Sequence, residues 1–263
     1  MLSASLENMT NSDDIYRAKQ NELKPFEFND SVTRVFDDMI RRSVPGYAQI
    51  IEFLPTVVRN LSVQMHATGR SYRFYDLGCS LGAGLLSLAH GVEHSHSKLK
   101  EHSFIGIDSS QPMIAQANEN LRPWFQLNGL SLELLTQDIL SLEIRPSDLV
   151  LMNFTLQFIE LSKRASLIGQ IYSSLQPGGC LVLSEKIRFD DSRVNSALID
   201  IHHQFKADQG YTELEISQKR DAIENVLIPE SIGAHVHRLE SAGFSVVTPW
   251  LQNLQFISFL AIK

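Results

Sequence analysis

The chain has 263 residues, of which 43% are hydrophobic and 20% charged, as in an ordinary soluble globular protein. It carries 30 acidic residues against 23 lysines and arginines, and the resulting net charge of -7 disfavours direct binding to nucleic acid. No apolar run is long enough to span a membrane, and the N-terminal residues lack the apolar core of a signal peptide. Two cysteines, Cys79 and Cys180, are too few for a disulfide framework, so we expect a cytoplasmic protein.

The N-terminal part of the chain predicts a tail followed by helices. Residues 1–28 are polar and aperiodic, which predicts a mobile tail, and residues 29–263 predict a single α/β domain. Within that domain, one helical pattern with an N-cap at Asp30 or Ser31, and a second pattern after it, predict an N-terminal helical cap over 29–68.

The break between those two helices contains Arg41, Arg42 and Tyr47 beside Pro45-Gly46. These side chains could cover the mouth of a ligand site. The pattern alone favours a solvated helix end with an interfacial tyrosine. The sequence leaves both interpretations open.

The stretch from Phe74 to Gly82 predicts a strand, a tight loop and the start of a helix. Gly78 and Gly82 permit a sharp turn and leave no Cβ between the backbone and a ligand. Such a unit opens an α/β sheet in which ligands bind beyond the carboxyl ends of the strands. The spacing Asp-x-Gly-x-x-x-Gly differs from the dinucleotide motif G-x-G-x-x-G, and it suits a nucleoside with an amino-acid tail better than a pyrophosphate.

Three further predicted strands lead to polar residues. Asp108 ends the second strand, where an acid can accept hydrogen bonds from ribose hydroxyls or cap the next helix. Asp138 follows the third strand and can accept from an adenine amino group, while Ile139 packs on the ring. Asn153 ends a fourth strand that is almost entirely apolar, as expected of a parallel strand covered on both faces.

The remaining pattern completes an α/β domain. A helix with Ser162 as its predicted N-cap leads to a fifth strand, in which we expect Cys180 to be part of the core. Residues 188–228 interrupt the alternation with two inserted helices, the second opened by the capping box Thr212-x-x-Glu215. A further helix and a closing pair of strands follow.

Four histidines, His90, His94, His96 and His102, lie close together in one polar connection. His90 and His94 have the i, i+4 spacing of a metal-binding pair, but no cysteine and no H-E-x-x-H motif accompanies them. We therefore interpret this stretch as a solvated loop and expect no metal site.

Gly78, Asp108, Asp138 and Asn153 thus mark the ends of four successive strands and predict a nucleoside-binding edge of the sheet. This pattern resembles the class I S-adenosylmethionine-dependent methyltransferase fold. That resemblance implies a Rossmann-like α/β fold with a seven-stranded, mostly parallel sheet, an antiparallel last strand and helices on both faces. The N-terminal and inserted helices would cap it.

From about Phe28 onwards the chain also resembles a narrower group, the carboxy-S-adenosyl-L-methionine synthase family. Four matching stretches are FxxMIxRSVPGY from Phe36 to Tyr47, DLGCSLG from Asp76 to Gly82, NFTLQF from Asn153 to Phe158 and LSEK from Leu183 to Lys186. The most specific matches lie in the inserted helices, which the general methyltransferase fold does not require. They are HHxFK from His202 to Lys206 and GYxELEISQKR from Gly210 to Arg220.

The narrower resemblance implies a particular reaction. S-adenosylmethionine and prephenate would give carboxy-S-adenosylmethionine and phenylpyruvate, because CO2 lost from prephenate is captured at the activated methyl carbon. The product would serve a second enzyme, a tRNA carboxymethyltransferase that modifies a wobble uridine. The resemblance also implies a homodimer, with the inserted helices as its interface.

The resemblance further implies which residues hold the cofactor: Tyr47, Gly78, Cys79, Ser80, Asp108, Ser109, Asp138, Ile139, Asn153 and Arg220. Tyr47 and Arg220 are also the predicted catalytic residues. Ser109 replaces an asparagine that is often found in the family, but ribose contact through Asp108 should survive this change. A guanidinium can grip a carboxylate with two hydrogen bonds, so Arg220 is predicted to hold the carboxylate of the product. Without the resemblance, a solvated arginine on a helix surface would be the favoured interpretation.

Two alternatives are an ordinary small-molecule methyltransferase and a non-catalytic S-adenosylmethionine-binding partner of a tRNA-modifying enzyme. The Asn/Asp-Pro-Pro-Tyr/Phe motif of amino-methylating enzymes is replaced here by Asn153-Phe154-Thr155-Leu156. The Pro-Cys nucleophile of pyrimidine C5 methyltransferases is also absent from the sequence. No residue stands out as a general base, and the sequence does not identify the residues that bind prephenate.

Overall fold

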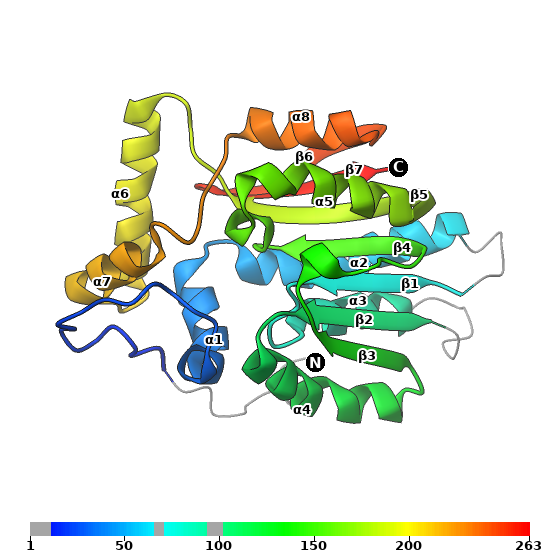
Figure 1. Ribbon diagram of the computed structural model, residues 1–263, viewed down its shortest axis with the longest axis horizontal. Coiled ribbons are helices and arrows are strands. Elements are labelled where there is room, and N and C mark those ends of the chain that lie inside the picture. Colours follow the sequence, from blue (N-terminus) through cyan, green and yellow to red (C-terminus); the bar gives the residue numbers. More distant parts are fainter. Residues whose placement is uncertain (1–11, 66–70, 94–101) are drawn as a thin grey trace.

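The computed structural model describes residues 12–65, 71–93 and 102–263, and within them seven strands form one sheet (Figure 1). The strands are β1 (Arg73–Leu77), β2 (Ser103–Asp108), β3 (Ser131–Thr136), β4 (Ser147–Asn153), β5 (Leu175–Lys186), β6 (Val246–Asn253) and β7 (Phe256–Ile262). Their order is β3-β2-β1-β4-β5-β7-β6. The pairs among β1 to β5 are parallel, and β7 is antiparallel to both β5 and β6. The predicted sheet, with its antiparallel last strand, is therefore confirmed.

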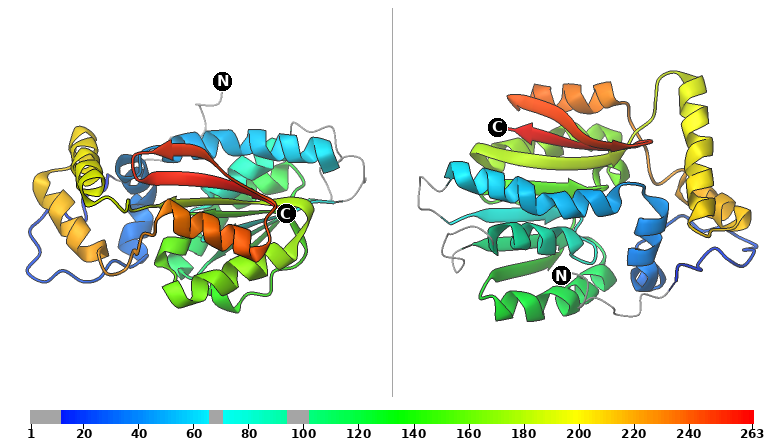
Figure 2. Two further views of the ribbon diagram at one scale, coloured as in Figure 1. Left: turned by 90° about the horizontal axis from the view of Figure 1, so that it is seen from above. Right: turned by 180° about the vertical axis from the view of Figure 1, so that it is seen from behind.

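Helices cover both faces of this sheet (Figure 2). In the described residues they are α1 (Asp30–Ser43), α2 (Tyr47–Met65), α3 (Ala83–Glu93), α4 (Gln111–Leu127), α5 (Leu161–Ser174), α6 (Ser192–Asp208), α7 (Glu213–Ile223) and α8 (Ile232–Ala242), with the short 3-10 helices η3 (Ile139–Ser141) and η4 (Leu156–Phe158). Helices α2, α3 and α4 pack on one face, and α5 and α8 on the other. None of the helices described here is both long and apolar enough to cross a membrane.

The strands alternate between the two cores. Phe74 of β1 packs on the face covered by α2, α3 and α4, while its neighbour Tyr75 packs on the face covered by α5 and α8. Phe104 and Ile105 of β2 divide in the same way. Since successive side chains of a strand point to opposite faces, a sheet covered twice needs apolar residues at nearly every central position. This requirement explains the almost continuous apolar runs of the sequence, including the fully buried Cys180.

Helices α1, α6 and α7 lie side by side beyond the carboxyl ends of the parallel strands (Figures 1 and 2). They cover the edge at which the polar strand ends meet. The capping box predicted for α7 is present, because the Thr212 hydroxyl accepts the Glu215 N–H at 3.3 Å and the Glu215 carboxylate accepts the Thr212 N–H at 2.8 Å. This second inserted helix therefore begins where the sequence predicted.

Two other predicted N-caps are wrong by one or two residues. The side-chain oxygen of Asn29 accepts the N–H groups of the next turn of α1, so that cap precedes Asp30 and Ser31. Helix α5 begins at Leu161, which places Ser162 inside its first turn. Short polar side chains are frequent both at caps and beside them, and a single-residue signal does not separate the two positions.

Residues 12–28 pack against α7, contrary to the mobile tail that the sequence predicted. Phe26 is buried, and its N–H donates to a carbonyl of α7 at 3.0 Å. The Gln218 side chain on α7 accepts the Gln20 N–H at 2.7 Å. The tail prediction is therefore wrong for this segment, because its polar groups find hydrogen-bond partners on a distant helix. Residues 1–11 lie outside the described residues.

Candidate active site

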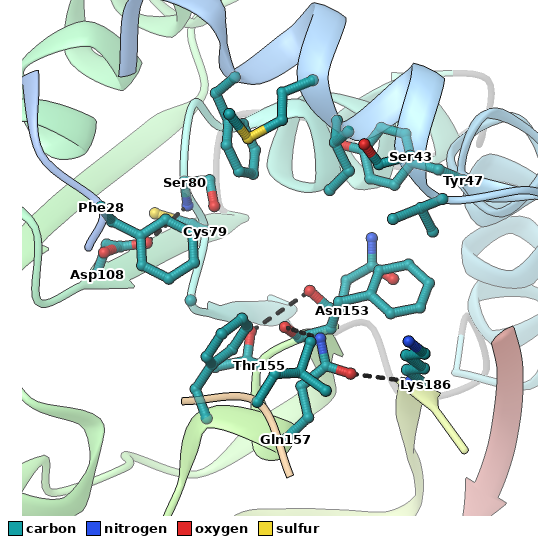
Figure 3. A pocket seen from close by; sticks show the side chains of 18 of the residues that line it. Phe28, Ser43, Tyr47, Cys79, Ser80, Asp108, Asn153, Thr155, Gln157 and Lys186 are labelled. Carbon is teal, nitrogen blue, oxygen red and sulfur yellow. Dashed lines mark hydrogen bonds between the residues drawn. The ribbon is translucent and has the colours of Figure 1, made fainter. Parts of the chain in front are cut away.

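A cavity of about 400 Å³ lies between the carboxyl edge of the parallel strands and helices α1, α6 and α7 (Figure 3). This volume falls in the usual range for sites that bind small molecules. Nine of the ten predicted site residues line the cavity: Tyr47, Gly78, Cys79, Ser80, Asp108, Ser109, Asp138, Ile139 and Asn153. The fold thus brings together predicted site residues that lie up to about a hundred residues apart along the chain.

Backbone contacts to β2 shape the loop after β1. Gly78 and Cys79 both donate their N–H groups to the Ile107 carbonyl, at 2.8 and 2.9 Å. Gly78 has a φ of +84°, and a Cβ at this position would lie 2.2 Å from the Thr155 hydroxyl oxygen. Glycine therefore avoids both the strain of a positive φ and this clash, and the loop presents bare backbone to the cavity.

The Asp108 carboxylate holds this loop in place at Ser80. Its carboxylate accepts the Ser80 N–H at 3.0 Å and the Ser110 N–H at 2.9 Å. Ser110 is the N-cap of α4, so Asp108 ties the glycine loop to the start of that helix. Burial raises the pKa of Asp108, and the hydrogen bonds from the backbone of Ser110, Ser80 and Ser109 oppose this rise.

Two groups behind the loop are deeply buried. Asp76 is 2% exposed, and burial together with the nearby charge of Asp108 raises its pKa to about 8. Burial likewise raises the pKa of the Cys79 thiol well above its usual range. Because the thiolate is the reactive form of cysteine, Cys79 serves as a packed side chain of the loop.

The segment after β4 is anchored by Glu185 of β5. This buried carboxyl accepts the N–H groups of Leu156 and Gln157, at 2.9 and 2.8 Å, where η4 begins. Burial raises the pKa of Glu185 to about 8. Gln157 in turn accepts the backbone N–H of Lys186 at 2.9 Å (Figure 3). These bonds fix the ends of β4 and β5 relative to each other.

Asp138, Ile139 and Asn153 complete the row of strand ends. Asp138 caps η3 by accepting the Leu140 N–H at 2.9 Å, and Ile139 is buried beside it. The side-chain oxygen of Asn153 is buried and has no hydrogen-bond partner among the described residues. A buried polar atom without a partner on the wall of a cavity marks a place for a polar group of a ligand.

The break between α1 and α2 serves two purposes. Tyr47 lines the cavity, and burial raises the pKa of its phenol above the usual range, so this group stays neutral. Arg42 turns to the helical cap instead. Its guanidinium lies 3.9 Å from the centroid of the Tyr211 ring, and its Nε donates to the Gln209 carbonyl at 2.9 Å. The ligand-covering interpretation of this stretch therefore applies to Tyr47 and not to Arg42.

Arg220 is the one predicted site residue that does not line the cavity of its own chain. Its side chain is 55% exposed on α7 and forms an ion pair with the adjacent Asp221 at 3.0 Å. The sequence left open whether Arg220 reaches its own site or that of a neighbouring subunit, and within one chain its side chain lies outside the cavity.

Sequence reasoning missed an aromatic wall. Phe28, in the segment before α1, packs edge-on against Phe158 of η4, with ring centroids 5.3 Å apart. Both rings line the cavity, as does Phe26. Because residues 1–28 were expected to form a mobile tail, no local pattern assigned Phe26 and Phe28 to the site. Phe158 lies in a stretch that carried the family resemblance, and it was not named as a site residue.

Three lysines were also missed. Lys186 at the end of β5, Lys206 on α6 and Lys219 on α7 all line the cavity. Each lies in a stretch that carried the family resemblance, and that stretch was the only signal for them in the sequence. For Lys206 and Lys219, helical periodicity could not show that the side chains point to the cavity, because the cap helices are covered on several sides.

The histidine-rich connection yields no metal site in the described residues. No group of three histidine, cysteine, aspartate or glutamate side chains among them could hold an ion. His102 is buried and accepts the Tyr72 N–H at 3.0 Å, and His90 lies against Trp124. His94 and His96 lie outside the described residues.

Comparison with known structures supports the fold. The chain is similar to magnesium protoporphyrin IX methyltransferase from Synechocystis PCC 6803, with a TM-score of 0.54 and 17% identity over 87% of this chain and 94% of that one. It is also similar to human N-acetylserotonin methyltransferase, with a TM-score of 0.52 and 13% identity over 89% of this chain and 58% of that one. The family model for a methyltransferase domain matches residues 75–181.

Comparison with curated sequences is more specific. The chain is 43% identical to the carboxy-S-adenosyl-L-methionine synthase of Hahella chejuensis over 95% of this chain and 98% of that protein. It is 43% identical to the enzyme of the same name from Pseudomonas aeruginosa over 97% of this chain and 100% of that protein. These matches extend through the cap helices, which the general methyltransferase fold does not need. The chain therefore belongs to the carboxy-S-adenosyl-L-methionine synthase family, on a class I S-adenosylmethionine-dependent methyltransferase fold.

Proposed function

We propose that the protein converts S-adenosylmethionine and prephenate to carboxy-S-adenosylmethionine and phenylpyruvate. S-adenosylmethionine supplies the methyl carbon that gains a carboxylate, and prephenate supplies that carboxylate as CO2. The hydroxyl of prephenate leaves with the methyl proton as water, so that atoms and charges balance. The supporting observation is that nine predicted site residues meet at one cavity in a chain whose curated relatives carry the synthase name.

The cavity fits S-adenosylmethionine chemically. The bare backbone of the loop at Gly78 allows a ligand to approach closely. Asp108 lies at the end of β2, where an acid is placed to accept from ribose hydroxyls, and Asp138 and Ile139 suit the edge and face of an adenine. The unpartnered side-chain oxygen of Asn153 offers an acceptor to the ammonium group of the methionine part.

The residues around this site would exclude water from the reacting atoms. Tyr47, Phe28 and Phe158 form apolar parts of the wall, and the docked N-terminal segment closes one side. In a dry cavity a carboxylate loses its hydration, which favours its departure as neutral CO2. Tyr47 would contribute to the reaction through its place in the cavity wall and through its neutral hydroxyl.

Arg220 requires a second chain in this proposal. Its guanidinium is exposed and lies outside its own cavity, so we propose a homodimer in which it reaches the carboxylated ligand of the neighbouring subunit. Arg220→Leu should keep the affinity for S-adenosylmethionine and lose the preference for the carboxylated form, as measured by calorimetry. An equal loss of affinity for both ligands would contradict this role.

Mixed dimers test the path across the interface. Arg220→Leu and Asp108→Ala subunits are each expected to be inactive alone. After unfolding and refolding together, one site in a mixed dimer carries both intact residues, so about a quarter of the activity should return by random pairing. Activity that does not return would place Arg220 in its own site or outside the reaction.

We further propose that the product serves a separate tRNA carboxymethyltransferase that acts on a wobble uridine in the cytoplasm. The net charge of -7 disfavours direct contact between this protein and tRNA. In a gel-shift assay at physiological salt, the purified protein should therefore leave tRNA unshifted.

The deciding experiment is the mass of the small molecule released when freshly purified protein is denatured, followed by incubation with prephenate. Release of a species heavier than S-adenosylmethionine by one CO2, and its renewed formation with phenylpyruvate, would support the proposal. Transfer of the methyl group to an acceptor would favour an ordinary methyltransferase. Bound S-adenosylmethionine without any turnover of prephenate would favour a non-catalytic partner.

A further inference from the structure

One end of the cavity is cationic. Lys186, Lys206 and Lys219 line it from three different elements, β5, α6 and α7. In the sheet, β5 lies beyond β4, whereas the strands of Asp108 and Asp138 lie on the other side of β1. Figure 3 shows Asp108 and Lys186 on opposite sides of the cavity with Asn153 between them. The three lysines therefore lie at the end of the cavity away from Asp108 and Asp138, the residues proposed to bind the nucleoside.

The three lysines differ in their partners. Lys219 is neutralised within the protein, because its ammonium group contacts the Asp13 carboxylate at 3.3 Å and donates to the Ser43 hydroxyl at 2.9 Å. Lys206 is 9% exposed, yet neither it nor Lys186 is paired with a carboxylate among the described residues. The Lys186 ammonium lies 5.9 Å from the centroid of the Phe256 ring. Within the described part of the chain neither Lys186 nor Lys206 is thus paired with an anion, and the Asp13 carboxylate that pairs with Lys219 acts on Lys206 only through its charge.

The neighbouring His202 does not add to this charge. Its Nε2 lies 2.8 Å from the Ser43 carbonyl, the contact of an N–H donor. Burial and the charge of Lys206 lower the pKa of His202 to about 3, so the ring is neutral at physiological pH. His202 therefore holds the backbone of Ser43 in place, and the positive charge facing the cavity belongs to the lysines.

Ammonium groups at Lys186 and Lys206 without a paired anion are energetically unfavourable when no ligand is bound. Burial and the charges of Lys219 and Lys186 lower the pKa of Lys206 to about 7, and burial lowers the pKa of Lys186. Unpaired charges inside proteins are retained chiefly where a ligand completes them. An anion placed between the two ammonium groups would satisfy both.

We propose that Lys186 and Lys206 form the subsite that grips one carboxylate of the second substrate, the carboxylate that stays on the product. The inference rests on the proposed function, in which that substrate is a dicarboxylate. The carboxylate that leaves as CO2 loses its charge on the way to the transition state, and a cation gripping it would stabilise the ground state more. The lysine pair therefore suits the carboxylate on the pyruvyl side chain of prephenate, which keeps its charge throughout the reaction.

The test compares Lys206→Met and Lys186→Met with Lys163→Met, which removes an exposed lysine of α5. Removing a charge-assisted hydrogen bond should raise the KM for prephenate about 10- to 100-fold in each cavity variant. Phenylpyruvate keeps the side-chain carboxylate and lacks the other, so its inhibition constant should rise by a similar factor. The dissociation constant of S-adenosylmethionine should stay unchanged in all three variants.

Several results would overturn the inference. An unchanged inhibition constant for phenylpyruvate would show that the lysines do not hold the retained carboxylate. A matching loss of S-adenosylmethionine affinity would assign them to the carboxylate of the methionine part. If Lys206→Met does not fold, the half-buried Lys186 decides the question alone. Wild-type protein that makes no carboxylated product from prephenate would refute the proposed function itself, a result that is distinct from these.

Discussion

Replacing Lys206 by methionine should stabilise the ligand-free protein. The lysine is 9% exposed, and burial with two neighbouring positive charges lowers its pKa from 10.5 to about 7. A difference of this size corresponds to about 5 kcal/mol between the protonated and the neutral form. Methionine keeps most of the buried stem and removes the charge, so after structural relaxation we expect a net gain of about 1–3 kcal/mol at pH 6.

The pH dependence of this gain follows from the direction of the shift. Because the pKa of Lys206 is lower in the folded state, the unfolded chain binds more protons between about pH 7 and pH 10.5, and stability due to this group rises with pH over that window. Below about pH 7 the full penalty is present. The gain from Lys206→Met should therefore be largest at pH 6 and small at pH 10. The charged and titratable groups around it are Asp13, Lys186, His202, His203 and Lys219.

The assay is urea unfolding of the wild type, Lys206→Met and the exposed control Lys163→Met at both pH values. The control should change stability by less than about 0.5 kcal/mol at either pH. Two outcomes would refute the reasoning: a Lys206→Met protein less stable than the wild type at pH 6, or equal gains at pH 6 and pH 10. The first would mean that the ammonium group has a stabilising partner, and the second that its proton affinity is not lowered by folding.

Three further substitutions test other parts of the structure. Gly78→Ala should weaken S-adenosylmethionine binding and lower the free energy of unfolding by about 2–4 kcal/mol, because the strain of a left-handed backbone adds to a clash with Thr155. The control Gly178→Ala also has a positive φ but open space around its Cβ, so it should cost only about 1–2 kcal/mol. Asp108→Asn should raise the S-adenosylmethionine dissociation constant by about 10- to 100-fold in calorimetry, and unchanged affinity would exclude a ribose contact. Arg164→Ala should lower the free energy of unfolding by about 3–5 kcal/mol, because the fully buried Arg164 guanidinium pairs with Glu230 and donates to the Gln157, Ile159 and Ile228 carbonyls, all of which would lose this donor. A loss below about 1 kcal/mol would show that this ion pair behaves like a surface pair.

The sequence predicted those parts of the site that depend on local signals. A strand followed by a polar residue is visible in the chain, and a parallel sheet necessarily gathers such strand ends at one edge. For that reason Gly78, Asp108, Asp138 and Asn153 meet at the cavity as predicted. The capping box was predicted from an equally local pattern, whereas the antiparallel last strand was implied by the family resemblance.

What the sequence did not reveal depends on contacts between distant segments. The N-terminal segment looks aperiodic because its partners lie on α7, about two hundred residues away. Lys206 and Arg220 both belong to amphipathic cap helices, yet the first faces the cavity and the second faces solvent. No hydrophobic pattern separates the two orientations, since the direction of each helix is set by the other cap elements.

The docking of the N-terminal segment also has a consequence for biosynthesis. The Asp13 carboxylate meets the Lys219 ammonium across 206 residues of sequence. The strands β1 to β4 follow one another in the chain and emerge from the ribosome well before α7. A single domain generally folds as a unit, so it cannot reach its final packing before its packing partners have been made. Residues 12–28 therefore wait for their α7 partners until most of the chain has been synthesised, and the first segment to be made is among the last to find its place.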